Sequence, residues 1–222
     1  APTSYQAAAL QKQLRLWFSN ILAPTVTLPE PDLKITADGD KFKLSVPLEA
    51  VTGDKKDQIT ASLRQTDGTK WSVEDVQFPS SGKMAVPMND SGDVMGTMTY
   101  SVGGQTIRML MDTALATRST ASLELRDFML RMGDGPQKHE QKFERYALQG
   151  NLIPSADGRL DFNQEGTITG WDILSQIDDG TAVGVHIRRL RETGRLEGIS
   201  RDRLEQGVKA IQTLVALHGP GK

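Results

Sequence analysis

The chain has 222 residues, and its 26 Lys and Arg against 28 Asp and Glu leave a formal net charge of −2. This balance argues against a dedicated nucleic-acid-binding protein, which usually carries a strong basic excess. The chain has no Cys, so disulfides, thiolate metal sites and cysteine nucleophiles are excluded. No apolar run approaches the ~18 residues needed to cross a bilayer. Length and composition together predict a single globular domain over residues 1–222.

The first segment, residues 1–23, is predicted to form an amphipathic helix. Thr3 or Ser4 can cap its amino end, and apolar residues recur at helical spacing from Leu10 to Ile21. Packing of this stripe on a sheet is favoured over docking to a membrane surface, because the helix has only a thin basic face. The chain opens at Ala1 without Met, which fits an exported protein whose signal peptide was removed, or a trimmed chain.

The middle of the chain, residues 32–169, alternates apolar and polar residues and predicts antiparallel strands. Pairs of turn residues that tolerate positive φ angles separate the runs. We expect hairpins at Asp38-Gly39 (33–36 with 41–48), at Asp67-Gly68 (58–65 with 70–78) and at Gly103-Gly104 (94–102 with 105–113), then strands at 120–132, 143–152 and 159–169. The turn signals leave open whether the sheet stays open, forms a sandwich or closes.

The last segment, residues 170–219, is predicted to cover one face of the sheet with helices. Helical spacing of apolar residues predicts helices over Trp171–Ile177, Val183–Leu190 and Leu204–Val215. The predicted fold is therefore α+β, with a large antiparallel β meander that can curve, flanked by N-terminal and C-terminal helices.

Two strand-like stretches and the first helix resemble a known family. The stretches are Gly158-Arg159-Leu160-Asp161-Phe162 and Gly166-Thr167-Ile168-Thr169-Gly170-Trp171-Asp172-Ile173-Leu174, and the helix runs from Ala7 to Leu22. They are similar to an exported proteobacterial family of unknown function, loosely similar to the AsmA-type and repeating-β-groove proteins of the cell envelope. The resemblance implies a periplasmic location and a curved sheet whose concave face holds lipid. It supplies no catalytic residues.

Motifs for catalysis or metal binding are weak in this sequence. It has no nucleophile elbow and no phosphate-binding glycine loop, so we do not expect an enzyme, a metal or a cofactor. Asp161, Asn163, Glu165 and Asp172 do have the spacing of an EF-hand-like calcium loop, with Gly166 at its sharp turn. A strand, turn and strand is favoured there, because Gly150, Pro154 and Gly158 leave no room for an incoming helix. An enzyme would have to use the carboxylates of Asp161, Glu165 and Asp172.

The methionines are unevenly placed, since all eight lie between residues 84 and 132. In the hairpin predicted at Gly103-Gly104, Met98 and Tyr100 share one face of the first strand, and Met109 and Met111 share one face of the second. Methionine is flexible and polarisable, so a patch of it adapts to ligands of variable shape, such as acyl chains. An ordinary apolar core is the more frequent use of such residues, and a copper(I) thioether site is the least favoured reading.

Six arginines lie close together near the carboxyl end of the chain: Arg188, Arg189, Arg191, Arg195, Arg201 and Arg203. Arginine forks can bind the phosphates of anionic lipids or the acidic patch of a partner. Neighbouring Glu and Asp residues can neutralise them on a helix surface. A solvated helix face, with His186 packed beside it, is therefore the favoured interpretation.

These features predict a non-catalytic, periplasmic protein of the cell envelope that binds lipid or another hydrophobic ligand. The candidate lining is Met98, Tyr100, Met109 and Met111 on an apolar concave face. The alternative is a structural or protein-interaction module whose helices dock a membrane-bound envelope partner. The two differ in their apolar surface, because a carrier needs a groove and an adaptor needs an exposed patch.

Overall fold

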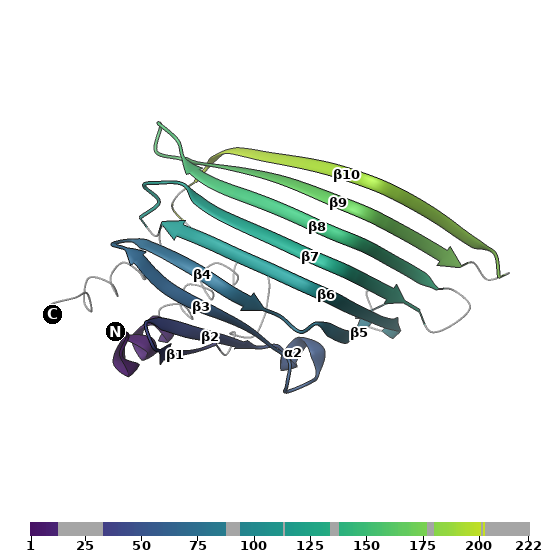
Figure 1. Ribbon diagram of the computed structural model, residues 1–222, viewed down its shortest axis with the longest axis horizontal. Helices are drawn as coiled ribbons and strands as arrows, with labels where there is room; N and C mark the ends of the chain where they lie inside the picture. Colours follow the sequence, from purple (N-terminus) through teal and green to yellow (C-terminus); the bar gives the residue numbers. More distant parts are fainter. Residues whose placement is uncertain are drawn as a thin grey trace.

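The computed structural model describes residues 1–12, 33–87, 94–112, 114–133, 138–176, 180–200 and 202. Residues 4–12 are helical. The other elements are β1 (Lys34–Asp38), β2 (Lys41–Pro47), α2 (Glu49–Thr52), β3 (Gln58–Asp67), β4 (Lys70–Gln77), β5 (Ser81–Pro87), β6 (Val94–Asp112), β7 (Ser119–Met132), β8 (His139–Pro154), β9 (Leu160–Gln176) and β10 (Ala182–Ile199). Figure 1 shows the long strands β6 to β10 running side by side.

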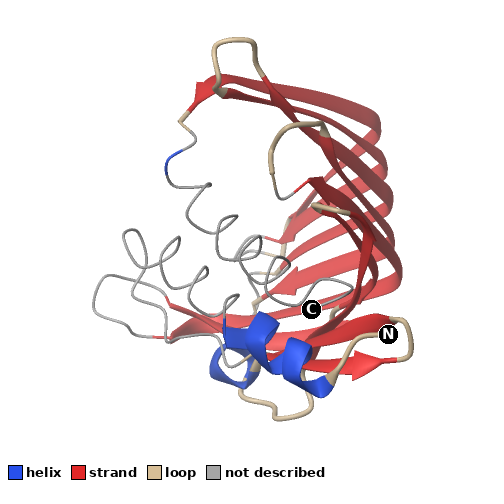
Figure 2. Cartoon of the chain, turned by 90° about the vertical axis from the view of Figure 1, so that its left-hand side faces the viewer, coloured by secondary structure: helices blue, strands red, loops and turns tan. Residues whose placement is uncertain are grey.

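The strands form one ten-stranded antiparallel sheet. Their order is β1-β2-β3-β4-β6-β7-β8-β9-β10, and β5 pairs with the first half of β6 where β4 pairs with its second half. β1 and β10 stand at the two ends of this order and do not pair with each other, so the sheet is open. It curls into an arc, as Figure 2 shows. The predicted antiparallel meander is confirmed.

The N-terminal helix begins with the cap that the sequence predicts. The Gln6 amide donates to Thr3 Oγ1 at 3.2 Å, and the Thr3 amide donates to Gln6 Oε1 at 3.0 Å. This reciprocal pair satisfies two amides that have no partner within the helix. The helix is confirmed over residues 4–12, and the rest of the predicted segment lies outside the described residues.

Two of the three predicted hairpins are confirmed. β1 turns into β2 at Gly39, whose φ is 63°, and β3 turns into β4 at Gly68, whose φ is 46°. A third turn of this kind, at Gly158 with a φ of 83°, joins β8 to β9. Glycine adopts these angles without the steric cost that a Cβ imposes.

The hairpin predicted at Gly103-Gly104 is wrong, because β6 runs without interruption through both glycines. Side chains of the neighbouring β7 lie over them instead. A Cβ at Gly103 would lie 2.8 Å from the Cβ of Asp127, and a Cβ at Gly104 would lie 2.9 Å from the guanidinium of Arg126. Glycine here allows a close approach between strands.

Two of the predicted C-terminal helices are also wrong. Trp171–Ile177 falls largely within β9, and Val183–Leu190 falls within β10, so the sheet extends to Ile199 rather than ending at residue 169. Arg188 to Arg195 therefore lie on a strand and not on a helix face. The third predicted helix, Leu204–Val215, lies outside the described residues, as do Arg201 and Arg203.

Five adjacent strands change their pattern along one row that crosses the sheet. In each of them, two polar or glycine residues stand side by side, and on β7 to β10 an apolar residue stands directly on either side of the pair. The five pairs are Gly103-Gly104, Arg126-Asp127, Glu144-Arg145, Thr169-Gly170 and Arg188-Arg189, in register from β6 to β10. Asp127 and Gly170 have positive φ angles of 50° and 63°. We call this row the crease.

The crease reverses the alternation, so that the same face stays apolar on both sides of it. Residues three apart on a regular strand point to opposite faces. Phe143 and Tyr146 are three apart and flank the crease on β8, yet their rings meet edge to face with centroids 6.1 Å apart. Cross-strand partners share a face, so the register extends this relation to the other long strands.

The sheet therefore has an apolar face and a polar face. The apolar face carries Met98, Tyr100, Val102, Ile107, Met109, Met111, Leu123, Leu125, Phe128, Leu130, Phe143, Tyr146, Leu148, Ile168, Trp171, Ile173, Val183, Val185, Ile187, Leu190 and Leu196. A few polar residues share it: Gln105, Gln141, Gln164 and Glu192. The polar face carries Glu124, Arg126, Arg131, Glu140, Lys142, Arg145, Asp172 and His186. The N-terminal helix packs at one end of the apolar face, where Ala7 and Leu10 form a buried cluster with Phe42, Leu63 and Trp71.

Candidate functional site: the apolar face

Aromatic side chains mark the centre of the apolar face, beside the crease. Phe128 of β7 and Phe143 of β8 are stacked, with ring centroids 4.5 Å apart and planes 13° from parallel. Tyr146 contacts Phe143 edge to face, and Trp171 is the register partner of Phe143 on β9. These residues were not predicted as site residues. Their signal in the sequence is the recurring pattern of two polar residues between apolar ones.

The four predicted lining residues share the apolar face but do not form one cluster. Met98 and Tyr100 lie before the crease on β6, and Met109 and Met111 lie after it. Met98 and Met109 are 11 positions apart on one strand, which corresponds to about 36 Å. A hairpin would have brought the two pairs together, whereas the continuous strand separates them.

Tyr100 is held by its own neighbours. Its hydroxyl donates to the Pro79 carbonyl at 2.9 Å, and its ring lies across Gly82, where a Cβ would come within 2.5 Å of Tyr100 Cε1. Burial, with the negative charge of Asp57 adding to it, raises the pKa of the Tyr100 hydroxyl. Tyr100 therefore presents a neutral ring and no free hydroxyl.

Met109 and Met111 lie beside the helix-covered end of the apolar face. Their register partners on β4 are Val73 and Trp71. Trp71 is 7% exposed and belongs to the cluster under the N-terminal helix. This pair therefore continues the core, whereas Met98 lies at the other end of β6, paired with Met84 and Met132.

The uncovered part of the apolar face is on β10. Val183, Val185, Leu190 and Leu196 all lie on this face, and their exposed fractions are 52%, 51%, 39% and 59%. Single exposed apolar residues are ordinary in soluble proteins. These four lie along one face of one strand, with Glu192 and Gly194 between Leu190 and Leu196 on the same face, and we call them the strip. The sequence analysis missed this strip because it assigned the segment to a helix.

The polar face is a network of ion pairs. Glu124 bridges Arg126 at 3.1 Å and Arg145 at 3.0 Å, and Glu140 bridges Arg131 at 2.7 Å and Lys142 at 3.0 Å. The hydrogen bond from Arg145 lowers the pKa of Glu124, and the hydrogen bond from Arg131 lowers the pKa of Glu140. This face is suited to contact with water.

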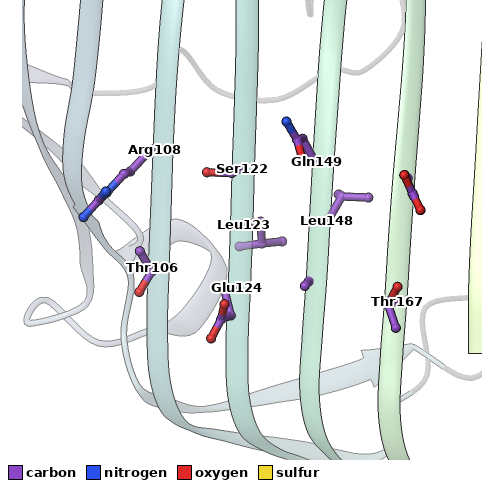
Figure 3. A pocket seen from close by; sticks show the side chains of 10 residues that line it. Thr106, Arg108, Ser122, Leu123, Glu124, Leu148, Gln149 and Thr167 are labelled. Carbon is purple, nitrogen blue, oxygen red and sulfur yellow. The ribbon is translucent and has the colours of Figure 1, made fainter. Parts of the chain in front are cut away.

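An open pocket on the polar face has a volume of about 410 Å³. Figure 3 shows its side chains coming from β6, β7, β8 and β9, among them Arg108, Ser122, Glu124, Gln149 and Thr167. The lining mixes charges, hydroxyls and an amide with the apolar side chains of Leu123, Ala147 and Leu148. A surface with three charged residues, Arg108, Glu124 and Glu165, is less suited to an acyl chain than the apolar face is.

The residues that have the spacing of a calcium loop belong to a strand in the structure. Asp161, Asn163, Glu165 and Asp172 all lie on the extended β9, where alternate side chains point the same way but stand about 7 Å apart. Asp161 instead accepts a hydrogen bond from the Gly198 amide at 3.0 Å, and Asn163 accepts one from Asn151 at 2.9 Å. Within the described residues, no group of three His, Asp or Glu side chains could hold a metal.

A serine and a histidine do meet on the sheet, at the ends of β8 and β9. His139 Nδ1 lies 2.8 Å from Ser175 Oγ, and Gln141 Nε2 lies 2.8 Å from His139 Nε2. The tautomer with its proton on Nδ1 accepts from the Gln141 amide at Nε2 and donates to Ser175 Oγ, whereas a general base has to accept the proton of its serine.

None of the described helices combines the length and the apolar character needed to cross a membrane. The apolar face and the crease define an open, two-faced antiparallel sheet as the class of this protein. No protein-family model, curated protein or solved structure matches this chain.

Proposed function

We propose that the protein binds lipid or another hydrophobic ligand on the apolar face of its sheet, without catalysis, in the periplasm of a cell envelope. The observation that carries the proposal is the continuity of this face across β6 to β10. Five strands reverse their alternation in one row, and this reversal keeps aromatic and aliphatic side chains on the same side of the sheet before and after the crease. The periplasmic location rests on the family resemblance alone.

The uncovered strip on β10 supports a point of entry for the ligand. An acyl chain that reaches Val185 and Leu190 can continue toward Ile187, Trp171 and Phe143 along the register of the sheet. Each buried CH₂ contributes about 0.8 kcal/mol, so an extended chain along this path binds without polar contacts. Met98 and Tyr100 lie in the same half of the face and are the predicted lining residues nearest to the path.

The first experiment is native mass spectrometry, with lipid extraction, of protein purified from its own envelope. Co-purifying lipid, or saturable binding of a fluorescent fatty acid, supports the proposal. If no lipid co-purifies and the fatty acid shows no saturable binding, the proposal fails.

Two leucines of similar exposure allow a matched test of the face. Leu190 is 39% exposed on the apolar face, and Leu174 is 41% exposed on the polar face. We expect Leu190→Asp to weaken fatty-acid binding at least about tenfold, because a carboxylate then stands in the path of the chain. Leu174→Asp should bind like the unmodified protein. Equal effects of the two substitutions on binding would refute this site.

A further inference from the structure

The two edge strands of the sheet, β1 and β10, differ in length and in the partners of their outward-facing backbone groups. β1 has only five residues, and the N-terminal helix lies against it. The Ile35 amide at this edge donates to Gln11 Oε1 of that helix at 2.9 Å. β10 has 18 residues, of which 14 are exposed, and its outer edge makes no hydrogen bond within the described residues. A long, open edge strand presents a row of unpaired N–H and C=O groups.

This open edge also carries charge that the sheet does not neutralise. Arg188, Arg189 and Arg191 are exposed at and beside the crease. Their register partners on β9 are Gly170, Thr169 and Thr167, all uncharged, and no ion pair among the described residues includes any of the three arginines. By contrast, Arg195 is bound to Glu197 at 2.7 Å.

From these features we infer that β10 is a docking edge for an extended, acidic strand of a protein partner, which adds to the sheet as its next strand. Such a strand satisfies three requirements at once. Its backbone pairs with the free edge, its apolar side chains stand beside Val185 and Leu190 and extend the apolar face, and its acidic side meets the three arginines. At the crease it repeats the pattern of the sheet, with two adjacent acidic residues between apolar ones.

Two other occupants fit the edge less well. A second copy of β10, paired antiparallel about the crease, would place Arg188 opposite Arg189 twice, and like charges directly opposite are destabilising. A membrane surface would attract the arginines and the apolar strip. It would leave the backbone groups of the edge without partners in an apolar medium, which costs several kcal/mol for each group.

The test uses the whole chain and a synthetic peptide as long as β10. The peptide alternates Val and Thr, with Glu at the two adjacent positions opposite Arg188 and Arg189 and at the position opposite Arg191. We expect saturable binding by isothermal titration calorimetry, together with slower hydrogen exchange of the β10 amides. A peptide with Gln in place of Glu should bind at least about tenfold more weakly. A peptide N-methylated at alternate residues should not bind, because it cannot pair along the edge.

A charge-swapped protein separates this proposal from the alternatives. The variant Arg188→Glu, Arg189→Glu, Arg191→Glu changes only exposed side chains, so its circular dichroism should match that of the unmodified chain. This variant should no longer bind the Glu peptide, and it should bind a peptide of the same pattern that has Lys in place of Glu. The proposal is overturned if the Glu peptide does not bind, if the N-methylated peptide binds equally well, or if only anionic phospholipid vesicles protect β10. Concentration-dependent dimerisation in sedimentation, with protection of β10, would identify a second copy as the occupant.

Discussion

The carboxylate of Asp112 organises the connection between β6 and β7. Asp112 is only 4% exposed, and it accepts hydrogen bonds from the amides of Ala114, Ala116 and Thr117 and from the hydroxyls of Thr69 and Thr117. The acceptor distances lie between 2.7 and 3.2 Å. A buried charge is stable only when it is paired or hydrogen-bonded in this way. The loop after β6 and the turn between β3 and β4 therefore depend on one side chain.

We expect Asp112→Asn to lower the free energy of unfolding by about 3 kcal/mol. The substitution replaces one acceptor oxygen with a donor that faces other donors, and hydrogen bonds to a charged group contribute about 1.5–3 kcal/mol each. Urea unfolding followed by circular dichroism measures the change. Asp40→Asn is the control, since Asp40 is exposed and makes only a 3.6 Å contact with Arg64; it should cost less than about 1 kcal/mol. Equal losses would show that the hydrogen bonds of Asp112 contribute little.

The same carboxylate makes stability depend on pH. Burial acts to raise the pKa of Asp112, but the hydrogen bonds from Thr69, Thr117 and Ala114 outweigh it and lower the pKa from 3.8 to about 2. A lowered pKa in the folded state means that the unfolded chain binds the proton more tightly. The contribution of the Asp112 carboxylate to the free energy of unfolding is therefore complete above pH ~4. As the pH falls toward ~2, about 2 kcal/mol of this contribution is lost. Urea midpoints measured across this range should fall less steeply for Asp112→Asn, and parallel slopes would contradict the assignment.

At the scale of the element, the crease constrains β9 most tightly at Gly170. Gly170 has a φ of 63°, and a Cβ there would lie 2.5 Å from Glu144 Cδ. Gly158 also has a positive φ, 83°, but a Cβ there would meet nothing within 4 Å. Substitutions at these two glycines therefore distinguish the cost of the backbone angle, which both share, from the cost of the contact with Glu144, which only Gly170 has.

We expect Gly170→Ala to destabilise the protein by about 2 kcal/mol and Gly158→Ala by about 1 kcal/mol, the cost of a left-handed angle in a residue with a Cβ. Chemical denaturation measures both values. In a double-mutant cycle, Glu144→Ala should remove the excess cost at Gly170 and leave that at Gly158 unchanged. If Glu144→Ala does not reduce the cost of Gly170→Ala, the close approach across the crease does not determine this position.

The crease also explains which elements could be predicted from the sequence. Hairpins at Asp38-Gly39 and Asp67-Gly68 follow from turn chemistry, which is local, and both are correct. Gly103-Gly104 carries the same local signal but serves contact between strands, which depends on Arg126 and Asp127 of another strand. On β10 the crease shifts the alternation by one residue. The shift makes Ile187 and Leu190 three apart, which is also the spacing of a helix face.

The candidate site was predictable only in part for the same reason. Met98, Tyr100, Met109 and Met111 do lie on the apolar face, because alternation within each half of β6 is local. The first two are far from the last two because β6 is one continuous strand and does not fold back as a hairpin. The strip at Val183, Val185, Leu190 and Leu196 could have been found by noticing that four segments, those of β7 to β10, carry a pair of polar or glycine residues between apolar ones.

At the scale of the whole molecule, an open sheet predicts a gradient of protection from hydrogen exchange. β7 and β8 are paired on both edges along nearly their whole length. β10 is paired only with β9. Amides that point toward a paired strand are protected, whereas amides of an edge strand that point outward exchange readily.

Residue-resolved exchange by NMR should therefore show slow amides throughout β7 and β8. On β10 it should show slow amides at every second residue, with fast ones between them. Outward and inward amides alternate because successive peptide groups of a strand face opposite edges. Amides of β1 provide the comparison, since the Ile35 amide at the other edge is bonded to Gln11 and should be slow. Uniform protection along β10 in the isolated protein would mean that this edge is already paired, which would contradict an open sheet and remove the basis for a docking edge.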